Sequence, residues 1–172
     1  EMGIEGNTIG VCPVGCSVMA YDYFNCDMIE AAHGRAPAVA TGVKRGNPDK
    51  FVFTYQGDGD LAAIGTAETV HAATRGENIT VIFINNTTYG MTGGQMSWTT
   101  LPGQRTETST KGRNCDLTGN PFHFPEMVAE SKGFHVAYAA RGAVSDGQTI
   151  NQTKRMIRNA FEAQLNNEGY SI

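Results

Sequence analysis

Two acidic and two amide side chains follow strongly apolar runs of this chain, at a spacing suited to holding a cation beside a phosphate. Asp58 and Asp60 stand in the string Gly-Asp-Gly-Asp directly after one apolar run, and Asn85 and Asn86 follow the next. If both runs are adjacent parallel strands, the two turns lie at the same edge of the sheet. Carboxylate and amide oxygens are ligands for a hard cation such as Mg²⁺, and glycine leaves the backbone open to a phosphate. The two turns therefore predict a metal-bridged diphosphate cofactor.

The elements that must position these turns alternate between strand and helix. Strand patterns cover residues 8–11, 51–56, 79–84 and 134–139, a further strand begins within 169–172, and helix patterns cover residues 36–44, 61–74, 124–132 and 151–166. Pro37 lies near the start of the first helix, and Gly76 ends the second. This alternation predicts an α/β fold: a doubly wound, mostly parallel sheet with helices on both faces. The polar segment 99–119 is interpreted as either a mobile loop over the cofactor or an interface element.

Composition limits the classes of protein to consider. The 172 residues and 18.4 kDa correspond to one domain, residues 1–172, and the net charge of −4 argues against nucleic-acid binding. Because no apolar run is long enough to span a membrane and no basic-then-apolar leader opens the chain, a cytoplasmic location without membrane contact is expected. The four cysteines are unevenly spaced and are expected to be free thiols or ligands. The abrupt first and last residues suggest a piece of a longer protein, truncated at both ends.

Two other hypotheses compete with the metal–diphosphate interpretation. Gly57-x-Gly59-x-x-Ala62 matches a dinucleotide-binding fingerprint, so a nucleotide-linked α/β dehydrogenase domain is the main alternative. That fingerprint needs an acid after the second strand to hold the ribose, and amides stand there instead. The carboxylates of Asp58 and Asp60 would also repel a bare pyrophosphate, whereas a divalent cation binds carboxylate and phosphate together. The third hypothesis, a non-catalytic scaffold, is disfavoured because both turns are intact.

The Gly-Asp-Gly string, followed after a βαβ-sized gap by Asn-Asn, resembles the thiamine diphosphate motif. The resemblance implies a ligand set of the Asp58 carboxylate, the Asn86 side-chain amide and the Thr88 backbone carbonyl, with two diphosphate oxygens and a water. Four longer stretches resemble the β subunit of 2-oxoacid:ferredoxin oxidoreductases, particularly the branch that acts on branched-chain substrates. They are 9–17 (IGVCPVGCS), 33–42 (HGRAPAVATG), 55–62 (YQGDGDLA) and 89–95 (YGMTGGQ).

The resemblance implies an enzyme that decarboxylates a 2-oxoacid such as 2-oxoisovalerate oxidatively to an acyl-CoA. Thiamine diphosphate and Mg²⁺ are the cofactors, electrons leave through a [4Fe–4S] cluster to ferredoxin, and coenzyme A takes the acyl group. The partners are an α subunit and ferredoxin. Cofactor contact is implied for four groups of residues: Gly15, Cys16 and Ser17; His33, Gly34 and Arg35; Gly57, Asp58, Gly59 and Asp60; and Asn86, Thr88, Tyr89, Gly90, Met91 and Thr92. The other histidines, His71, His123 and His135, are expected on helix or strand surfaces.

Two chemical groups that the family needs are missing from this sequence. Cys16 matches one ligand of the [4Fe–4S] cluster, but a cluster needs four thiolates and Cys12, Cys26 and Cys115 do not match the other ligand positions. We therefore expect Cys16 to hold a cluster only in the full-length protein and this chain alone to hold none. The glutamate that activates thiamine is expected on the partner subunit. No catalytic residue is assigned here, and the isolated chain is expected to be inactive.

Overall fold

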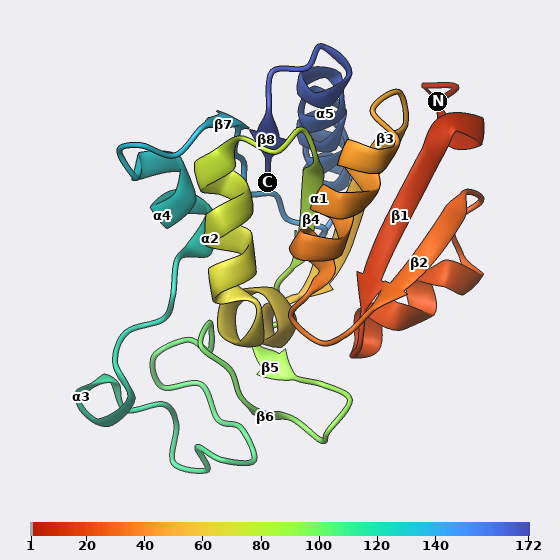
Figure 1. Cartoon of the computed structure of the whole chain (residues 1–172). Coiled ribbons are helices and arrows are strands. Elements are labelled where there is room, and N and C mark those ends of the chain that lie inside the picture. The colour runs from red at the N-terminus through yellow and green to blue at the C-terminus, as the bar shows by residue number, and fades with distance from the viewer. Residues whose placement is uncertain (1) are drawn as a thin grey trace.

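The structure, a computed structural model, describes residues 2–172, which form a six-stranded parallel sheet with a two-stranded hairpin beyond one edge (Figure 1). The order in the sheet is β2-β1-β3-β4-β8-β7. Its strands are β1 (Thr8–Pro13), β2 (Asp27–Ala31), β3 (Phe51–Gly57), β4 (Thr80–Ile84), β7 (Val136–Tyr138) and β8 (Tyr170–Ser171). The antiparallel hairpin is β5 (Thr88–Tyr89) with β6 (Gln95–Met96).

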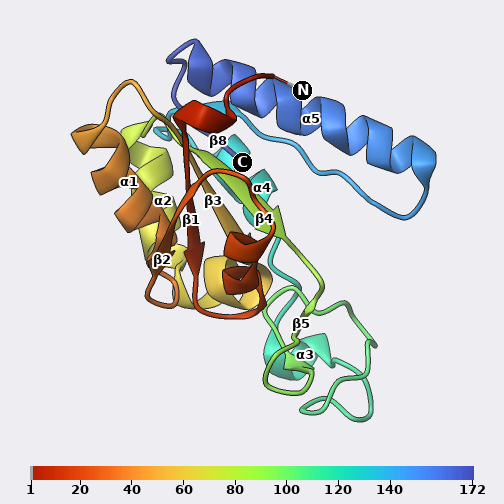
Figure 2. The same ribbon diagram turned by 90° about the vertical axis from the view of Figure 1, so that its right-hand side faces the viewer.

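Helices cover both faces of this sheet (Figure 2). The longer helices are α1 (Ala36–Gly46), α2 (Thr66–Arg75), α4 (Phe124–Glu130) and α5 (Gly147–Leu165), and the shorter ones are η1 (Glu5–Asn7), η2 (Cys16–Asp22), η3 (Asp60–Ile64) and α3 (Cys115–Thr118). Side chains alternate across β3: Val52 joins the core beneath α1 and α2, whereas Phe51 and Phe53 contact Phe161 of α5 on the other face. The predicted doubly wound α/β fold is therefore confirmed.

Several element boundaries differ from the sequence predictions. β2 was not predicted, because its sequence Asp-Met-Ile-Glu-Ala is half polar and it lies at the sheet edge. The helix expected over 61–74 is interrupted: η3 is a π-helix, in which the Gly65 amide donates to the Asp60 carbonyl at 2.7 Å, and α2 follows it. α5 begins at Gly147 rather than 151, because the Asp146 carboxylate caps the amides of Gln148 and Thr149.

The strand order reverses direction next to β1, which marks one part of the carboxyl edge of the sheet. From β1 the chain moves outward to β2 and then returns to the opposite side of β1 to form β3. The two connections leave in opposite directions, and ligands of such sheets bind outside the carboxyl ends of the strands at this point, here β1 and β3. The residues that follow these ends, and the β5–β6 hairpin after β4, lie at this edge (Figure 1).

No helix within residues 2–172 is both long enough and apolar enough to cross a bilayer. The core under α1 and α2 is continuous with side chains of α4 and β8, including the buried Phe124 and Tyr170. Burial raises the pKa of the Tyr170 phenol far above its usual range.

Candidate functional site

The turn after β3 combines buried carboxylates with the start of a helix. Gly57 ends β3, and Asp58 and Gly59 already have helical geometry that continues into η3. The first amides of a helix have no carbonyl partner within the helix, so they are available to an anion. Asp58 and Asp60 are nevertheless only 3% and 4% exposed, which places two acidic side chains under the same turn.

Asp58 is held by two hydroxyl groups that the sequence interpretation did not include. The hydroxyls of Ser97 and Thr99 donate to its Oδ2 at 2.5 and 2.6 Å, and the Thr99 hydroxyl also lies 2.8 Å from Asn85 Oδ1. Every hydrogen bond that described residues donate to this carboxylate ends on Oδ2. Asp58 Oδ1 therefore remains for another partner, and both donors are neutral.

The second turn, after β4, holds a backbone conformation that is unusual for a β-branched residue. Thr87 has φ +67°, in the left-handed region that normally favours glycine. Its amide donates to Asn85 Oδ1 at 3.1 Å, and its carbonyl accepts from the Thr100 hydroxyl at 2.5 Å. Such strain persists only where surrounding contacts fix it, and it is concentrated at functional sites. The Thr88 amide donates to Asn86 Oδ1 at 3.3 Å, so the predicted metal residues Asn86 and Thr88 share this turn.

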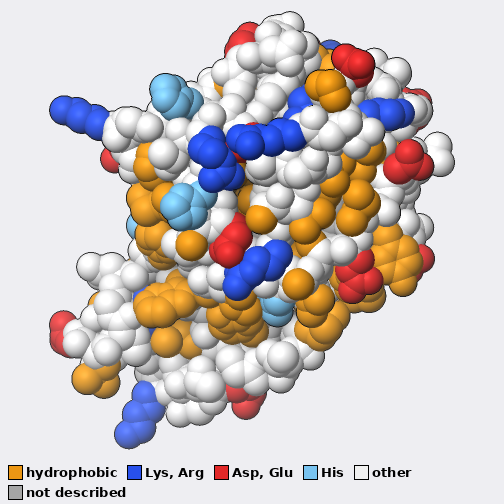
Figure 3. All heavy atoms as spheres, viewed as in Figure 1, with side chains coloured by type: hydrophobic (Ala, Val, Ile, Leu, Met, Phe, Trp, Pro, Cys, Tyr) orange, Lys and Arg blue, Asp and Glu red, His pale blue; other side chains and the backbone are white. Residues whose placement is uncertain are grey.

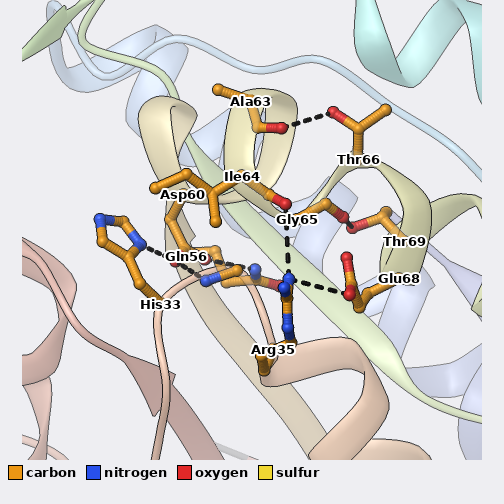
Figure 4. Close-up of polar contacts among 11 residues, drawn as sticks. His33, Arg35, Gln56, Asp60, Ala63, Ile64, Gly65, Thr66, Glu68 and Thr69 are labelled. Carbon is orange, nitrogen blue, oxygen red and sulfur yellow. Dashed lines mark hydrogen bonds and ion pairs between the residues drawn. The ribbon is translucent and has the colours of Figure 1, made fainter.

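Asp60 has a different set of partners, all from this chain (Figure 4). Its Oδ1 lies 2.5 Å from both His33 Nδ1 and the Gly34 amide, and its Oδ2 receives Gln56 Nε2 at 2.6 Å. The carboxylate thus fixes the turn that carries His33, and this bond directs the Nε2 side of the imidazole away from Asp60. Gln56 is fully buried and was also missed in the sequence interpretation.

Close backbone contact fixes the same turn against η3. Gly34 has φ +74°, and a Cβ there would meet Ile64 and the Gly65 amide at 2.6–2.8 Å. Arg35 extends away from His33 towards α2, where its Nη1 lies 2.8 Å from Glu68 Oε1 (Figure 4). Of the predicted pair, His33 is therefore fixed by Asp60, whereas Arg35 forms an ion pair with α2.

Tyr89 and Gly90 connect the hairpin to both turns. A Cβ on Gly59 would overlap the Tyr89 ring, so this helical glycine is required by space rather than by its backbone angles. A Cβ on Gly90 would lie 3.5 Å from Cys16 Sγ and 3.6 Å from Asn86 Nδ2. Burial and, to a smaller extent, the charge of Asp58 raise the pKa of the Tyr89 phenol. The phenol is therefore neutral at physiological pH.

The remaining predicted residues lie at the margin of this cluster. Gly15 approaches His33, since a Cβ on Gly15 would lie 3.9 Å from the imidazole Cε1. Ser17 is buried in η2. Met91 is exposed, and the Thr92 hydroxyl donates to Gln95 Oε1 within the hairpin rather than to the Gly57–Asp60 turn.

The other histidines are exposed, as expected, but only His71 lies within a helix. His123 and His135 were expected on a helix or a strand, but each lies one residue before its element, α4 and β7 respectively.

The four cysteines are free thiols. Cys12 is buried, and desolvation, with a smaller contribution from Cys26, raises its pKa to about 11. Cys16 is exposed and is the cysteine that lies beside Asn86 and Gly90. Within residues 2–172, no cluster of three or more His, Cys, Asp or Glu side chains could hold a metal ion. A cation at the two turns would need amide and backbone oxygens as well as the carboxylate of Asp58.

With this geometry in place, comparison with known proteins gives the class. Residues 13–171 match the family described as thiamine pyrophosphate enzyme, C-terminal TPP binding domain, and the chain belongs to that family.

Two similar curated proteins come from Methanothermobacter thermautotrophicus. The chain is 46% identical, over its whole length and 36% of the relative's, to "Ketoisovalerate oxidoreductase subunit VorA". It is 40% identical, over 99% of its length and 55% of the relative's, to "2-oxoglutarate synthase subunit KorB". Among solved structures, a 2-oxoglutarate:ferredoxin oxidoreductase from Magnetococcus marinus matches with a TM-score of 0.80 and 27% identity. That match covers 97% of this chain and 53% of the other. The chain thus spans between a third and about half the length of these relatives.

Proposed function

We propose that this chain is the thiamine diphosphate- and Mg²⁺-binding part of the catalytic subunit of a 2-oxoacid:ferredoxin oxidoreductase. Its membership of the thiamine pyrophosphate enzyme family supports the cofactor, and the names of its relatives support the reaction class. The higher identity to the ketoisovalerate enzyme than to the 2-oxoglutarate enzyme supports a branched-chain 2-oxoacid as substrate.

The observation that carries the metal assignment is the state of Asp58. A buried carboxylate is costly unless a positive charge or several hydrogen bonds compensate it. Asp58 receives only two neutral hydroxyls, both on Oδ2, and its Oδ1 is left without a donor from the described residues. A Mg²⁺ ion bound by Asp58, Asn86 Oδ1 and the Thr88 carbonyl would supply that charge and fits the oxygen ligands that this ion prefers.

The backbone around the first turn suits the diphosphate. The helix-initiating amides of Asp58, Gly59 and Asp60 would donate to phosphate oxygens, and the space beside Gly57 is open, since a Cβ there meets nothing within 4 Å. Tyr89, Gly90, Met91 and Thr92 would lie along the cofactor beyond its diphosphate. His33, held by Asp60, would direct its Nε2 towards the reacting end.

Thiamine diphosphate, when bound, supplies the carbanion that makes decarboxylation of a 2-oxoacid possible. This chain's own contribution is to hold the diphosphate and metal, to exclude water around Asp58 and to fix the orientation of His33. A complete site needs an α subunit that provides the activating glutamate, and further thiolates that complete a [4Fe–4S] cluster with Cys16. Coenzyme A would accept the acyl group and ferredoxin the electrons, in a complex that we place in the cytoplasm.

The test is calorimetric titration of thiamine diphosphate into the full-length subunit in its complex, with and without Mg²⁺. We expect Mg²⁺-dependent binding that Asp58→Asn weakens about 100-fold, since a metal ligand is lost. Asp49→Asn, at an exposed turn, is the matched control and should bind as the parent does. Absence of Mg²⁺-dependent binding in the parent complex would refute the proposal. Tight, Mg²⁺-independent binding of a nicotinamide nucleotide would support the dehydrogenase alternative instead.

A further inference from the structure

A buried arginine lies at the centre of the long polar segment 97–120, which follows the hairpin. Arg113 is only 4% exposed, and within residues 2–172 none of the ion pairs involves it. The backbone of Arg113 is also tied to the first half of the segment, because its amide donates to the Gln104 carbonyl and its carbonyl accepts from Gly103. A charge buried this deeply must be compensated by other groups.

Backbone carbonyls at both ends of the segment compensate it. Nη1 donates towards the carbonyls at the start, Ser97 (3.5 Å), Trp98 (3.0 Å) and Thr100 (2.6 Å). Nε and Nη2 donate to those at the end, Thr118 (3.3 Å), Gly119 (3.0 and 3.2 Å) and Asn120 (3.1 Å). The planar guanidinium therefore joins the two ends of the segment.

The residues at the start of the segment are those that contact both turns of the candidate site. Ser97 and Thr99 hold Asp58, and Thr99 also reaches Asn85. Thr100 donates to the carbonyl of Thr87, the residue with the strained backbone. Among the described residues, every hydrogen bond from the segment to the Asp58 carboxylate therefore comes from residues 97–100. The Arg113 guanidinium donates to three of the four carbonyls of these residues.

We propose that Arg113 is a positioning residue for the metal site: it fixes residues 97–100 so that their hydroxyls orient Asp58 and hold the Asn85–Thr88 turn. This inference rests on the proposed function, because it assigns Arg113 a role towards the same Mg²⁺ ion. Groups that orient a metal ligand through hydrogen bonds commonly change metal affinity by about 10- to 100-fold when removed. Among the described residues, no hydrogen bond or ion pair joins the Arg113 side chain to the Asn85–Thr88 turn or to the Gly57–Asp60 turn.

Lysine cannot replace this arginine. The guanidinium has several N–H groups in a fixed plane, whereas an ammonium is a single point that cannot reach both ends of the segment. Arg105 provides a matched control on the same segment. It is exposed, and its Nε donates to one carbonyl, that of Thr110, at 2.9 Å, away from residues 97–100.

The experiment measures thiamine diphosphate binding to the full-length subunit in its complex over a range of Mg²⁺ concentrations. The variants are Arg113→Met, Arg113→Lys and Arg105→Met. We expect Arg113→Met to raise the Mg²⁺ concentration for half-maximal binding about tenfold, and Arg113→Lys to raise it by a smaller factor. At saturating Mg²⁺ the number of binding sites should match the parent, which a general loss of folding would not allow. Arg105→Met should leave the Mg²⁺ midpoint unchanged.

A double variant shows whether Arg113 acts through the hydroxyls. Ser97→Ala with Thr99→Val removes both donors to Asp58, so adding Arg113→Met to it should raise the Mg²⁺ midpoint little further. The proposal would be overturned if Arg113→Met raised the Mg²⁺ midpoint by the same factor with and without the two hydroxyls. A folded Arg113→Met or Arg113→Lys complex with the Mg²⁺ midpoint of the parent would also overturn it. Loss of folding in both Arg113 variants would also overturn it, because Arg113 would then be a general folding residue. If the parent complex itself shows no Mg²⁺-dependent binding, it is the proposed function that fails.

Discussion

At the residue scale, Asp58 and Asp60 are separated by a single glycine and yet have different partners. Asp60 is saturated by the chain itself, through His33, Gly34 and Gln56. Asp58 receives only hydroxyl donors on one oxygen. Two carboxylates this close in a buried turn would repel each other. The Mg²⁺ ion of the proposed function, bound to Asp58, would relieve that repulsion.

Gly59, between them, gives a prediction at the same scale. Gly59→Ala should lower the stability of the protein by about 1–2 kcal/mol, because overpacking against the Tyr89 ring outweighs the gain of about 1 kcal/mol in helix propensity. Urea unfolding measures this change. Gly57→Ala is the control: its Cβ enters open space, so stability should change by less than about 0.5 kcal/mol. A Gly59→Ala protein more stable than the parent by about 1 kcal/mol would show that Tyr89 moves at no cost.

At the element scale, η3 departs from regular α-helical geometry, whereas α5 begins with a regular cap. η3 widens into a π-helix where Gly34 and Gly65 come into backbone contact, and π-bulges of this kind are frequent at functional sites. α5 begins with a capping box, in which Asp146 accepts from the Thr149 amide and Thr149 accepts from the Asp146 amide. The end of η3 thus lies against a glycine from a distant turn, whereas the start of α5 is set by the residue immediately before the helix.

The α5 cap has a defined pH dependence. Hydrogen bonds from the Thr149 amide and the Ser145 hydroxyl lower the pKa of Asp146 below its usual value. Since the folded pKa is the lower one, the cap stabilises the protein above the ordinary Asp pKa of about 3.9 and loses that contribution as pH falls through the folded value. The difference in unfolding free energy between the parent and Asp146→Ala should therefore be smaller at pH 3 than at pH 6. Asp146→Asn, which still caps without a charge, should show a smaller difference from the parent at pH 6 than Asp146→Ala. A gap that is independent of pH would contradict this account.

At the scale of the whole molecule, exposed apolar side chains surround the carboxyl edge of the sheet. Met91, Trp98, Leu101 and Leu117 are each more than half exposed. Figure 3 shows hydrophobic side chains gathered across the lower half of this face, where the strands end. Large exposed apolar patches commonly mark interfaces. Under the proposed function, the α subunit that completes the cofactor site would cover this edge.

Trp98 tests that arrangement, because its side chain is 56% exposed while its backbone is fixed within the segment 97–120. Trp98→Glu should weaken assembly with the α subunit at least about 30-fold, as expected for a buried aromatic at the centre of an interface. Sedimentation or calorimetry of the two purified subunits measures this affinity. Val144→Glu changes a more exposed apolar side chain on the connection into α5 and should assemble normally. Equal affinities for both variants would place the partner elsewhere.

The sequence by itself determined the fold class and the edge of the sheet at which the two polar turns lie. Apolar runs such as those of β3 and β4 are long and unambiguous, and the polar turns after them must lie at one edge of a parallel sheet. The strand β2 was missed because its half-polar pattern has no clear period. The π-helix was missed because one extra residue in a turn hardly changes the spacing of apolar residues along a helix.

Only the tertiary structure decided how the two acids differ and what holds them. Asp58 and Asp60 are alike in sequence, but their partners Ser97 and His33 come from distant segments that no local pattern connects to the turn. The role of the segment 97–120 was likewise undecidable from its polar composition. The hydroxyls of residues 97–100 reach Asp58 and Thr87 because Arg113 binds backbone carbonyls at both ends of the segment. Such hydrogen bonds depend on three-dimensional distance rather than on residue type.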